Sequence, residues 1–151
     1  VAMLRTGVVL SPAGGMLQQV LPLFLAGLGG PVATSGGESH DGSPWLSWIG
    51  ADDIAGAFAH AVLDDGVTGP VNAVAPEPVT AKEFATVLGR VLRRPALIPV
   101  PEAGPRLLLG EEGRVETVAA DQKVVADRLV SSGYEMRDPE LEGALRHVLG
   151  R

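Results

Sequence analysis

The sequence predicts an α/β domain, because strand-like and helix-like segments alternate along it. Two short apolar runs, residues 4–10 and 71–74, are typical of strands buried on both faces in a parallel sheet. Between them, apolar residues recur at the helical spacing i, i+3, i+4, i+7, i+8 at Ile54, Ala57, Phe58, Ala61 and Val62. We therefore expect all five of these side chains to lie on one buried helix face.

The N-terminal third predicts a strand, a helix and a loop. Apolar residues at helical spacing run from Leu17 to Leu28, and we expect Pro22 to kink or split this helix because proline lacks an amide hydrogen. The glycines at 27–30 end it. Residues 31–44 are rich in Gly and Ser, and they predict a mobile surface loop.

The stretch 44–63 predicts a strand, a tight turn and a helix, around which the rest of the chain is arranged. The strand is rich in aromatic and branched side chains. Asp52 or Asp53 is expected to cap the helix, because a carboxylate accepts the unpaired amide hydrogens there. Gly56 weakens a helix interior, so we expect another backbone to approach it closely.

In the second half, Thr80 and Glu83 form a capping-box pattern before a helix that ends near Pro95. Residues 121–131 predict a helix with Val125 and Leu129 turned inward. Asp138 and Pro139 are expected at the N-cap and first position of the last helix, whose apolar stripe is Leu141, Ala144, Leu145, Val148 and Leu149.

Composition narrows the class of partner. The 151 residues carry a formal net charge of −6 and no cysteine, which argues against nucleic acid or an anionic membrane as partner and excludes sulfur ligands and disulfides. No apolar run is long enough to span a bilayer, so a cytoplasmic protein is expected. Because Val1 runs straight into a strand-like segment, we expect the chain to be part of a larger protein.

The residues alone reveal no catalytic group. His60 and Asp64 are four apart and could share a metal, but no third ligand is evident, so solvated helix residues are the expectation for His60 and His147. The same holds for the arginines at 90, 93 and 94, which resemble an anion site less than a solvated helix end. Neither a nucleophile elbow nor a complete Gly-rich dinucleotide turn is present.

Several motifs taken together resemble the extended short-chain dehydrogenase/reductase superfamily, in particular its NAD-dependent epimerase/dehydratase-like subfamily, sometimes described as sugar-nucleotide epimerases. The resemblance covers nearly the whole chain. It is carried by residues 5–10, 14–17, 21–24 and 27–30, then by 45–49 with 52–55, 72–76 with 78–80, 94–95, 121–124, 133–134 and 139–145.

The resemblance implies the C-terminal portion of a Rossmann-type fold, with late parallel strands and a substrate-binding lobe over residues 1–151, in which residues 105–151 form a C-terminal helical extension. NAD or NADP is implied for the full-length parent and not for this chain alone, because members carry their Gly-rich turn and Tyr-x-x-x-Lys pair elsewhere. The single tyrosine, Tyr134, is followed four residues later by Asp138. No catalytic or metal-binding residue is therefore expected here.

Two departures from the family pattern affect the substrate. Leu46 stands where nucleotide-sugar enzymes carry an arginine that grips the diphosphate, and Gly50 stands where a histidine commonly precedes the paired aspartates. These two departures favour a small-molecule substrate other than a sugar nucleotide. We expect its pocket to be lined by side chains beyond the first strand and on the first helix and central strand: Ser11, Pro12, Leu17, Leu21 and Trp48.

Three functions remain open: a portion of an NAD(P)-dependent epimerase or oxidoreductase, a non-catalytic member that senses a dinucleotide or acts through protein contacts, and a structural fragment. The strand at 4–10 should pair with 71–74 on one side and with a strand of the missing half on the other. With that second side open, we expect self-association or pairing with the missing half.

Overall fold

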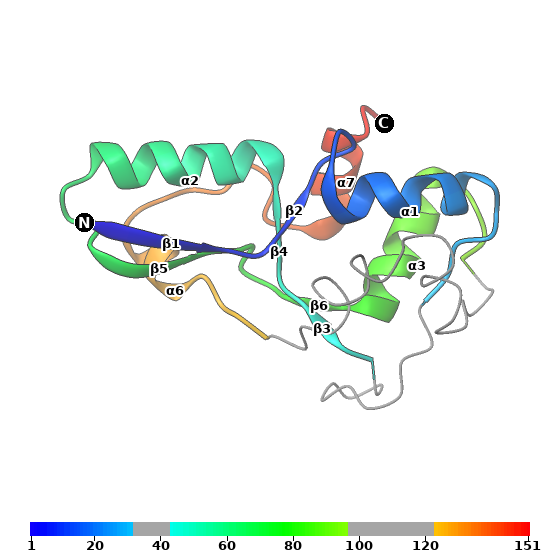
Figure 1. Cartoon of the computed structure of the whole chain (residues 1–151), viewed down its shortest axis with the longest axis horizontal. Coiled ribbons are helices and arrows are strands. Elements are labelled where there is room, and N and C mark those ends of the chain that lie inside the picture. The colour runs from blue at the N-terminus through cyan, green and yellow to red at the C-terminus, as the bar shows by residue number, and fades with distance from the viewer. Residues whose placement is uncertain (32–42, 97–122) are drawn as a thin grey trace.

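The computed structural model describes residues 1–31, 43–96 and 123–151 (Figure 1). Strands and helices alternate, as the sequence predicts. The strands are β1 (Ala2–Thr6), β2 (Val8–Leu10), β3 (Trp45–Leu46), β4 (Trp48–Gly50), β5 (Gly69–Ala73) and β6 (Val79–Thr80). The helices are α1 (Gly15–Leu25), α2 (Ala51–Leu63), α3 (Ala81–Leu92), α6 (Asp127–Ser131) and α7 (Leu141–Val148).

The strand predicted at 4–10 is divided in two, and each half pairs with a different neighbour. β1 runs parallel to β5, with Leu4 opposite Val71, which confirms the predicted pairing. β2 runs parallel to β4, with Leu10 opposite Gly50. The central strand is divided as well, because β3 leaves β4 to pair antiparallel with β6.

Gly7 is the point at which the first strand changes partner. Its amide donates to the carbonyl of Ala73 at 3.2 Å, and the next amide, that of Val8, donates to the carbonyl of Ser47 at 2.8 Å. A Cβ atom on Gly7 would lie 2.6 Å from the Ser47 carbonyl oxygen and 2.9 Å from a methyl group of Val74. Only glycine leaves room for the Ser47 backbone and the Val74 side chain to come this close.

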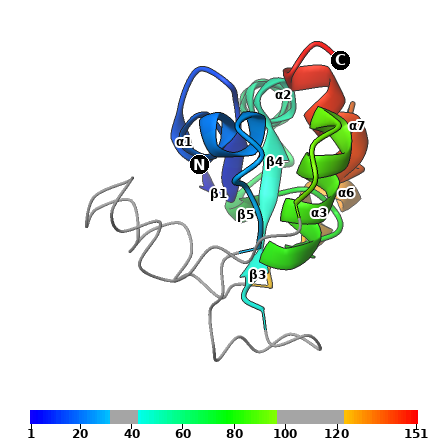
Figure 2. The ribbon, with the colours of Figure 1, turned by 90° about the vertical axis from the view of Figure 1, so that its right-hand side faces the viewer.

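The buried side chains form two clusters. The larger is closed by α1, α3 and α7 around β2, β3 and β4, and in Figure 2 α1 lies on one side of β4 while α3 and α7 lie on the other. The smaller lies between the β1–β5 pair, α2 and α6. In Figure 1, α2 and α6 lie on opposite sides of that pair.

Two helix predictions are confirmed, and of the kink or split expected at Pro22 the split does not occur. The capping box of α3 forms completely, since the Glu83 amide donates to Thr80 Oγ1 at 3.1 Å and the Thr80 amide donates to Glu83 Oε2 at 2.7 Å. The stripe of α7 is buried at Leu141, Ala144 and Leu145 and half-buried at its end. Pro22 does not split the first helix, because α1 continues through it to Leu25; Pro22 is exposed, so its missing hydrogen bond leaves a carbonyl that water can reach.

The predictions for the last two helices need correction at their ends. α6 begins only at Asp127, and within it Leu129 is buried as predicted, while Val125 precedes the helix and is exposed. The N-cap of α7 is Glu140, not Asp138. The rest of the predicted helix at 121–122, and nearly all of the predicted loop at 31–44, lie outside the described residues. Within the described ranges, no helix is both long and apolar enough to cross a membrane.

Candidate functional site

The carboxyl end of β2 forms a tight polar turn in front of α1. Ser11 and Gly14 are bridged by backbone pairing, and the Ala13 amide donates to Ser11 Oγ at 3.2 Å. Gly14 is the N-cap of α1, where no side chain accepts a hydrogen bond from the first turn. Gly15 follows with a φ of 67°, which favours glycine. Pro12 is exposed at the tip of this turn.

The other three residues predicted to line a substrate pocket lie together in the larger cluster. Leu17 and Trp48 are fully buried, and Leu21 packs against the same cluster while remaining half-buried. The indole of Trp48 donates to the carbonyl of Glu77 at 3.2 Å. Leu17, Leu21 and Trp48 therefore belong to one packed core, whereas Ser11 and Pro12 lie on the turn that follows β2.

Asp53 does not cap α2, contrary to the sequence prediction. Gly50 is the N-cap, and Asp53 lies in the first turn with its side chain turned into the protein. It accepts hydrogen bonds from the amides of Arg137 at 2.7 Å and Asp138 at 3.1 Å, and it is 3% exposed. The carboxylate therefore fixes the segment before α7 to the start of α2.

Tyr134 belongs to the same junction. Its hydroxyl donates to the Asp53 carbonyl at 2.9 Å and lies 3.3 Å from Asp53 Oδ1. Burial raises the pKa of Tyr134 above its ordinary value, and the charge of Asp53 and the hydrogen bond to it raise that pKa further. A phenol used as a base would need the opposite change, so Tyr134 acts here as a stable hydrogen-bond donor.

Both helical histidines have protein partners, which corrects the expectation that they are solvated. His147 contacts the Asp138 carboxylate through Nδ1 and lies 3.2 Å from Asp52 Oδ2 through Nε2, so it links α7 to α2. His60 Nε2 lies 2.9 Å from Ser132 Oγ and 3.9 Å from Asp64. In the part of the chain that the structure describes, no three His, Asp or Glu side chains are arranged to hold a metal.

The network around Asp53 was missed by the sequence reasoning because its members are far apart in the chain. Asp53 and the amides it accepts are separated by more than eighty residues. The available signal was the crowding of Gly133, Tyr134 and Asp138 before an amphipathic helix, together with Gly56 in α2. A Cβ on Gly56 would lie 2.3 Å from the Tyr134 hydroxyl, so the close neighbour of this glycine is a side chain, not the backbone we expected.

The outer face of α3 carries an open groove of about 260 Å³, lined by Lys82, Glu83, Thr86, Val87 and Arg90. Its polar groups are largely engaged within the protein. Glu83 closes the capping box, and Arg90 Nη1 lies 3.1 Å from Glu142 Oε2, so Arg90 is paired and not simply solvated. Hydrogen bonds from Arg146 and then Arg90 lower the pKa of Glu142.

Comparison with known proteins finds relatives that this chain resembles. A family described as "Domain of unknown function (DUF1731)" matches residues 100–148. An epimerase family protein of Bos taurus, SDR39U1, is 41% identical over 146 residues, which cover 96% of this chain and 47% of the relative. The chain thus spans about half the length of the curated relatives it matches.

Comparison with solved structures shows the same similarity. The crystal structure of the human epimerase family protein SDR39U1 (isoform 2) with NADPH matches with a TM-score of 0.82 and 35% identity, over 99% of this chain and 48% of that one. A UDP-glucose 4-epimerase of Thermus thermophilus in complex with NAD shares the fold, with a TM-score of 0.64 at 20% identity, over 99% of this chain and 46% of that one. This chain is therefore similar to about half of an epimerase family protein, and its fold is the C-terminal part of an extended, Rossmann-type short-chain dehydrogenase/reductase.

Proposed function

We propose that the chain is the substrate-binding C-terminal portion of an NAD(P)-dependent epimerase/dehydratase or oxidoreductase, whose cofactor turn and catalytic Tyr and Lys lie in the other half of the parent protein. The observation that carries this is the parallel β1–β5 pair: within the described residues β1 has a strand partner on one edge only. The similar human protein, about twice as long, was crystallised with NADPH.

The substrate site we propose lies at the turn after β2, formed by Ser11 and Pro12 over the core that contains Leu17, Leu21 and Trp48. In open α/β sheets, ligands bind beyond the carboxyl ends of the strands, and this turn is at such an end. Leu46 is buried in the same core and offers no charge to a diphosphate, which favours a small substrate other than a sugar nucleotide.

Calorimetry with NADPH and NADH, on both the full-length parent and the 151-residue chain, tests whether the other half of the parent supplies the cofactor site. We expect micromolar binding by the parent and none by the chain alone, because the amides that hold the pyrophosphate are supplied by a Gly-rich turn in the other half. Micromolar binding by the chain alone would refute the proposal that the cofactor site lies in the other half. Failure of the parent to bind either nucleotide would refute the proposal that NAD or NADP is its cofactor.

The substrate site is tested in the parent by replacing Ser11 with alanine. The expected result is a raised KM for the small-molecule substrate, with an unchanged Kd for the nucleotide. Ser131→Ala is the control, because Ser131 is exposed and its hydroxyl donates to a backbone carbonyl on α6, a helix at the opposite end of the molecule from α1. Equal KM values for both variants and the parent would contradict the assignment of Ser11.

A further inference from the structure

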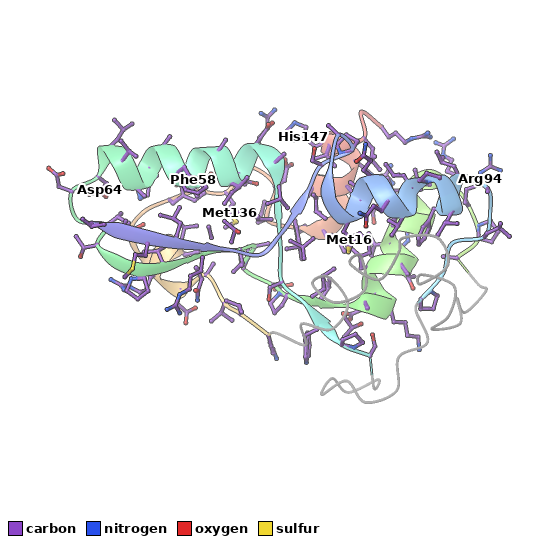
Figure 3. All side chains as sticks on the ribbon, viewed as in Figure 1. Met16, Phe58, Asp64, Arg94, Met136 and His147 are labelled. Carbon is purple, nitrogen blue, oxygen red and sulfur yellow. The ribbon has the colours of Figure 1, made fainter. Side chains whose placement is uncertain are left out.

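His147 lies between two carboxylates that belong to different elements. Its Nδ1 contacts Asp138 in the segment before α7, and its Nε2 lies 3.2 Å from Asp52 Oδ2 on α2. His147 is in the last turn of α7, while Asp52 is in the first turn of α2. Figure 3 labels His147 beside the end of α2 at which that helix begins. The imidazole therefore joins the end of one helix to the start of the other.

A neutral imidazole cannot donate to both carboxylates. It carries one N–H, and its other ring nitrogen is an acceptor. An ionised carboxylate also only accepts, so in the neutral form one of the two contacts sets a lone pair against a carboxylate oxygen. The protonated ring has an N–H on each nitrogen and can make a charge-assisted hydrogen bond to each side. The observed arrangement, with a carboxylate at both nitrogens, therefore fits the charged form of His147.

The positions of His147 and Asp52 on their helices favour the same form. A cation is stabilised in the last turn of a helix and an anion in the first turn, because of the unpaired backbone groups there. His147 and Asp52 occupy these two places. The His147 side chain is 31% exposed, so protons reach it from the solvent.

Arg137 competes with His147 for Asp52. Its Nη1 lies 3.5 Å from the same oxygen, Asp52 Oδ2. Asp52 therefore has two cationic partners when His147 is protonated and one when it is not. Asp53 takes no part in this exchange, because its carboxylate accepts the amides of Arg137 and Asp138.

The other charged side chains around α7 are paired elsewhere or exposed. Among the elements that pack against α7, β2 and β4 contain no titratable residue. On α3, Arg90 pairs with Glu142, and Arg146 of α7 pairs with the same carboxylate. Arg151 follows the helix and is exposed. In the part of the chain that the structure describes, the charged groups that meet His147 are therefore the two aspartates, with one arginine behind them.

We propose that Asp138, His147 and Asp52 form a pH-sensitive latch between α7 and α2. With His147 protonated, both ring nitrogens are bonded and the latch is closed. When the ring loses a proton, the remaining hydrogen stays with Asp138, the nearer acceptor, and Asp52 pairs with Arg137 alone. Histidine is the side chain that ordinarily changes charge between about pH 5 and 8. The latch therefore closes as pH falls through that range and opens as pH rises.

The latch acts on a helix that helps to close the larger cluster. α7 buries Leu141, Ala144 and Leu145 there. It also packs against β2, the strand that ends at the Ser11 turn. Opening the latch leaves this buried stripe to hold α7 without the link to α2. The latch requires neither the cofactor nor the substrate of the proposed function.

Hydrogen exchange of the α7 amides in the full-length parent tests the latch. It is measured at about pH 5.5 and about pH 8, on either side of the ordinary histidine range, as protection factors that remove the intrinsic pH dependence. In the wild type we expect protection about threefold to fivefold greater at the lower pH, the size of effect that a partly exposed ion pair supports. His147→Gln keeps a donor but never gains a charge, and Asp52→Asn removes the carboxylate on α2. Both variants should lose the rise.

His60→Gln is the matched control. His60 is a histidine of α2 whose Nε2 lies 2.9 Å from the Ser132 hydroxyl, a partner that a neutral ring satisfies, and it has no contact with α7 among those described. This variant should keep the full wild-type rise. Protection of α7 that does not change with pH in the wild type would overturn the latch, as would a rise that survives in His147→Gln. Loss of the rise in His147→Gln but not in Asp52→Asn would overturn the link to α2.

Discussion

The two hydrophobic clusters differ in how far the described chain closes over them. The larger cluster is enclosed by three helices, and Leu25 and Leu28 are the exposed large apolar residues near it. The smaller cluster is surrounded by many more, namely Val1, Met3, Phe58, Val62, Leu63, Val125 and Val130. Large exposed apolar patches are uncommon on soluble proteins, so the end around the smaller cluster is the less completely covered of the two within the described residues.

The sharpest test of this comparison is the same substitution in each cluster. Leu88 of α3 and Leu129 of α6 are both fully buried. We expect Leu88→Ala to cost about 4 kcal/mol and Leu129→Ala about 2 kcal/mol, because a five-residue helix at the open end can shift to fill the cavity. Urea unfolding followed by tryptophan fluorescence measures both. A larger cost for Leu129→Ala would break the comparison.

Asp53 joins the two ends, and its removal should be the next largest effect. Asp53→Ala leaves the amides of Arg137 and Asp138 without their buried acceptor, and we expect a loss of about 3 kcal/mol. Asp52→Ala is the control. Asp52 is exposed and its ion pairs lie on the surface, so a loss of at most about 0.5 kcal/mol is expected from thermal unfolding. Similar losses for the two variants would contradict the bridging role of Asp53.

The contact between α2 and Tyr134 is tested at Gly56. Gly56→Ala should destabilise by about 1–2 kcal/mol, because the new methyl group meets the Tyr134 hydroxyl, which hydrogen bonds hold in place. In a Tyr134→Ala background the same change should instead stabilise by about 1 kcal/mol, the ordinary helix preference for alanine. A double-mutant cycle of unfolding free energies measures the coupling. A coupling of zero would mean that Tyr134 does not press on this flank.

The smallest effect is expected at the exposed charges that link α7 to α3. The pKa of Glu142 is lowered in the folded state by hydrogen bonds from Arg146 and Arg90. A lowered folded-state pKa gives stability that is present above the ordinary glutamate range and is lost as pH falls through the folded-state value. The Tm difference between wild type and Glu142→Gln should therefore shrink towards acid and in high salt. Glu135→Gln, a change at another exposed carboxylate, is the matched control for the loss of one surface charge.

Local signals in the sequence were sufficient where the partners are close in the chain. The Thr80–Glu83 capping box and the apolar stripe of α7 follow from residues within a few turns of each other, and both are confirmed. The β1–β5 pairing was also predicted, from the place that these two strands take in the fold that the resemblance implies. Those features indicated the α/β class and, through the family resemblance, the C-terminal part of a Rossmann-type fold.

Tertiary structure decided what depends on distant parts of the chain. Nothing local tells whether Asp53 caps its own helix or accepts amides more than eighty residues away. Nothing in the sequence distinguishes Gly7 from the other glycines. In the structure, the carbonyl of Ser47 and the side chain of Val74 lie so close to it that no Cβ fits. Helical periodicity predicted that Phe58 and Val62 are buried, and this prediction is wrong within the described chain, where they are 49% and 79% exposed, because periodicity shows that residues share a face and not that the face is covered. The sequence by itself therefore determined the elements and their class, while the packing of residues remote in sequence decided where the first strand changes partner, which carboxylate is buried and which helix flank is left open.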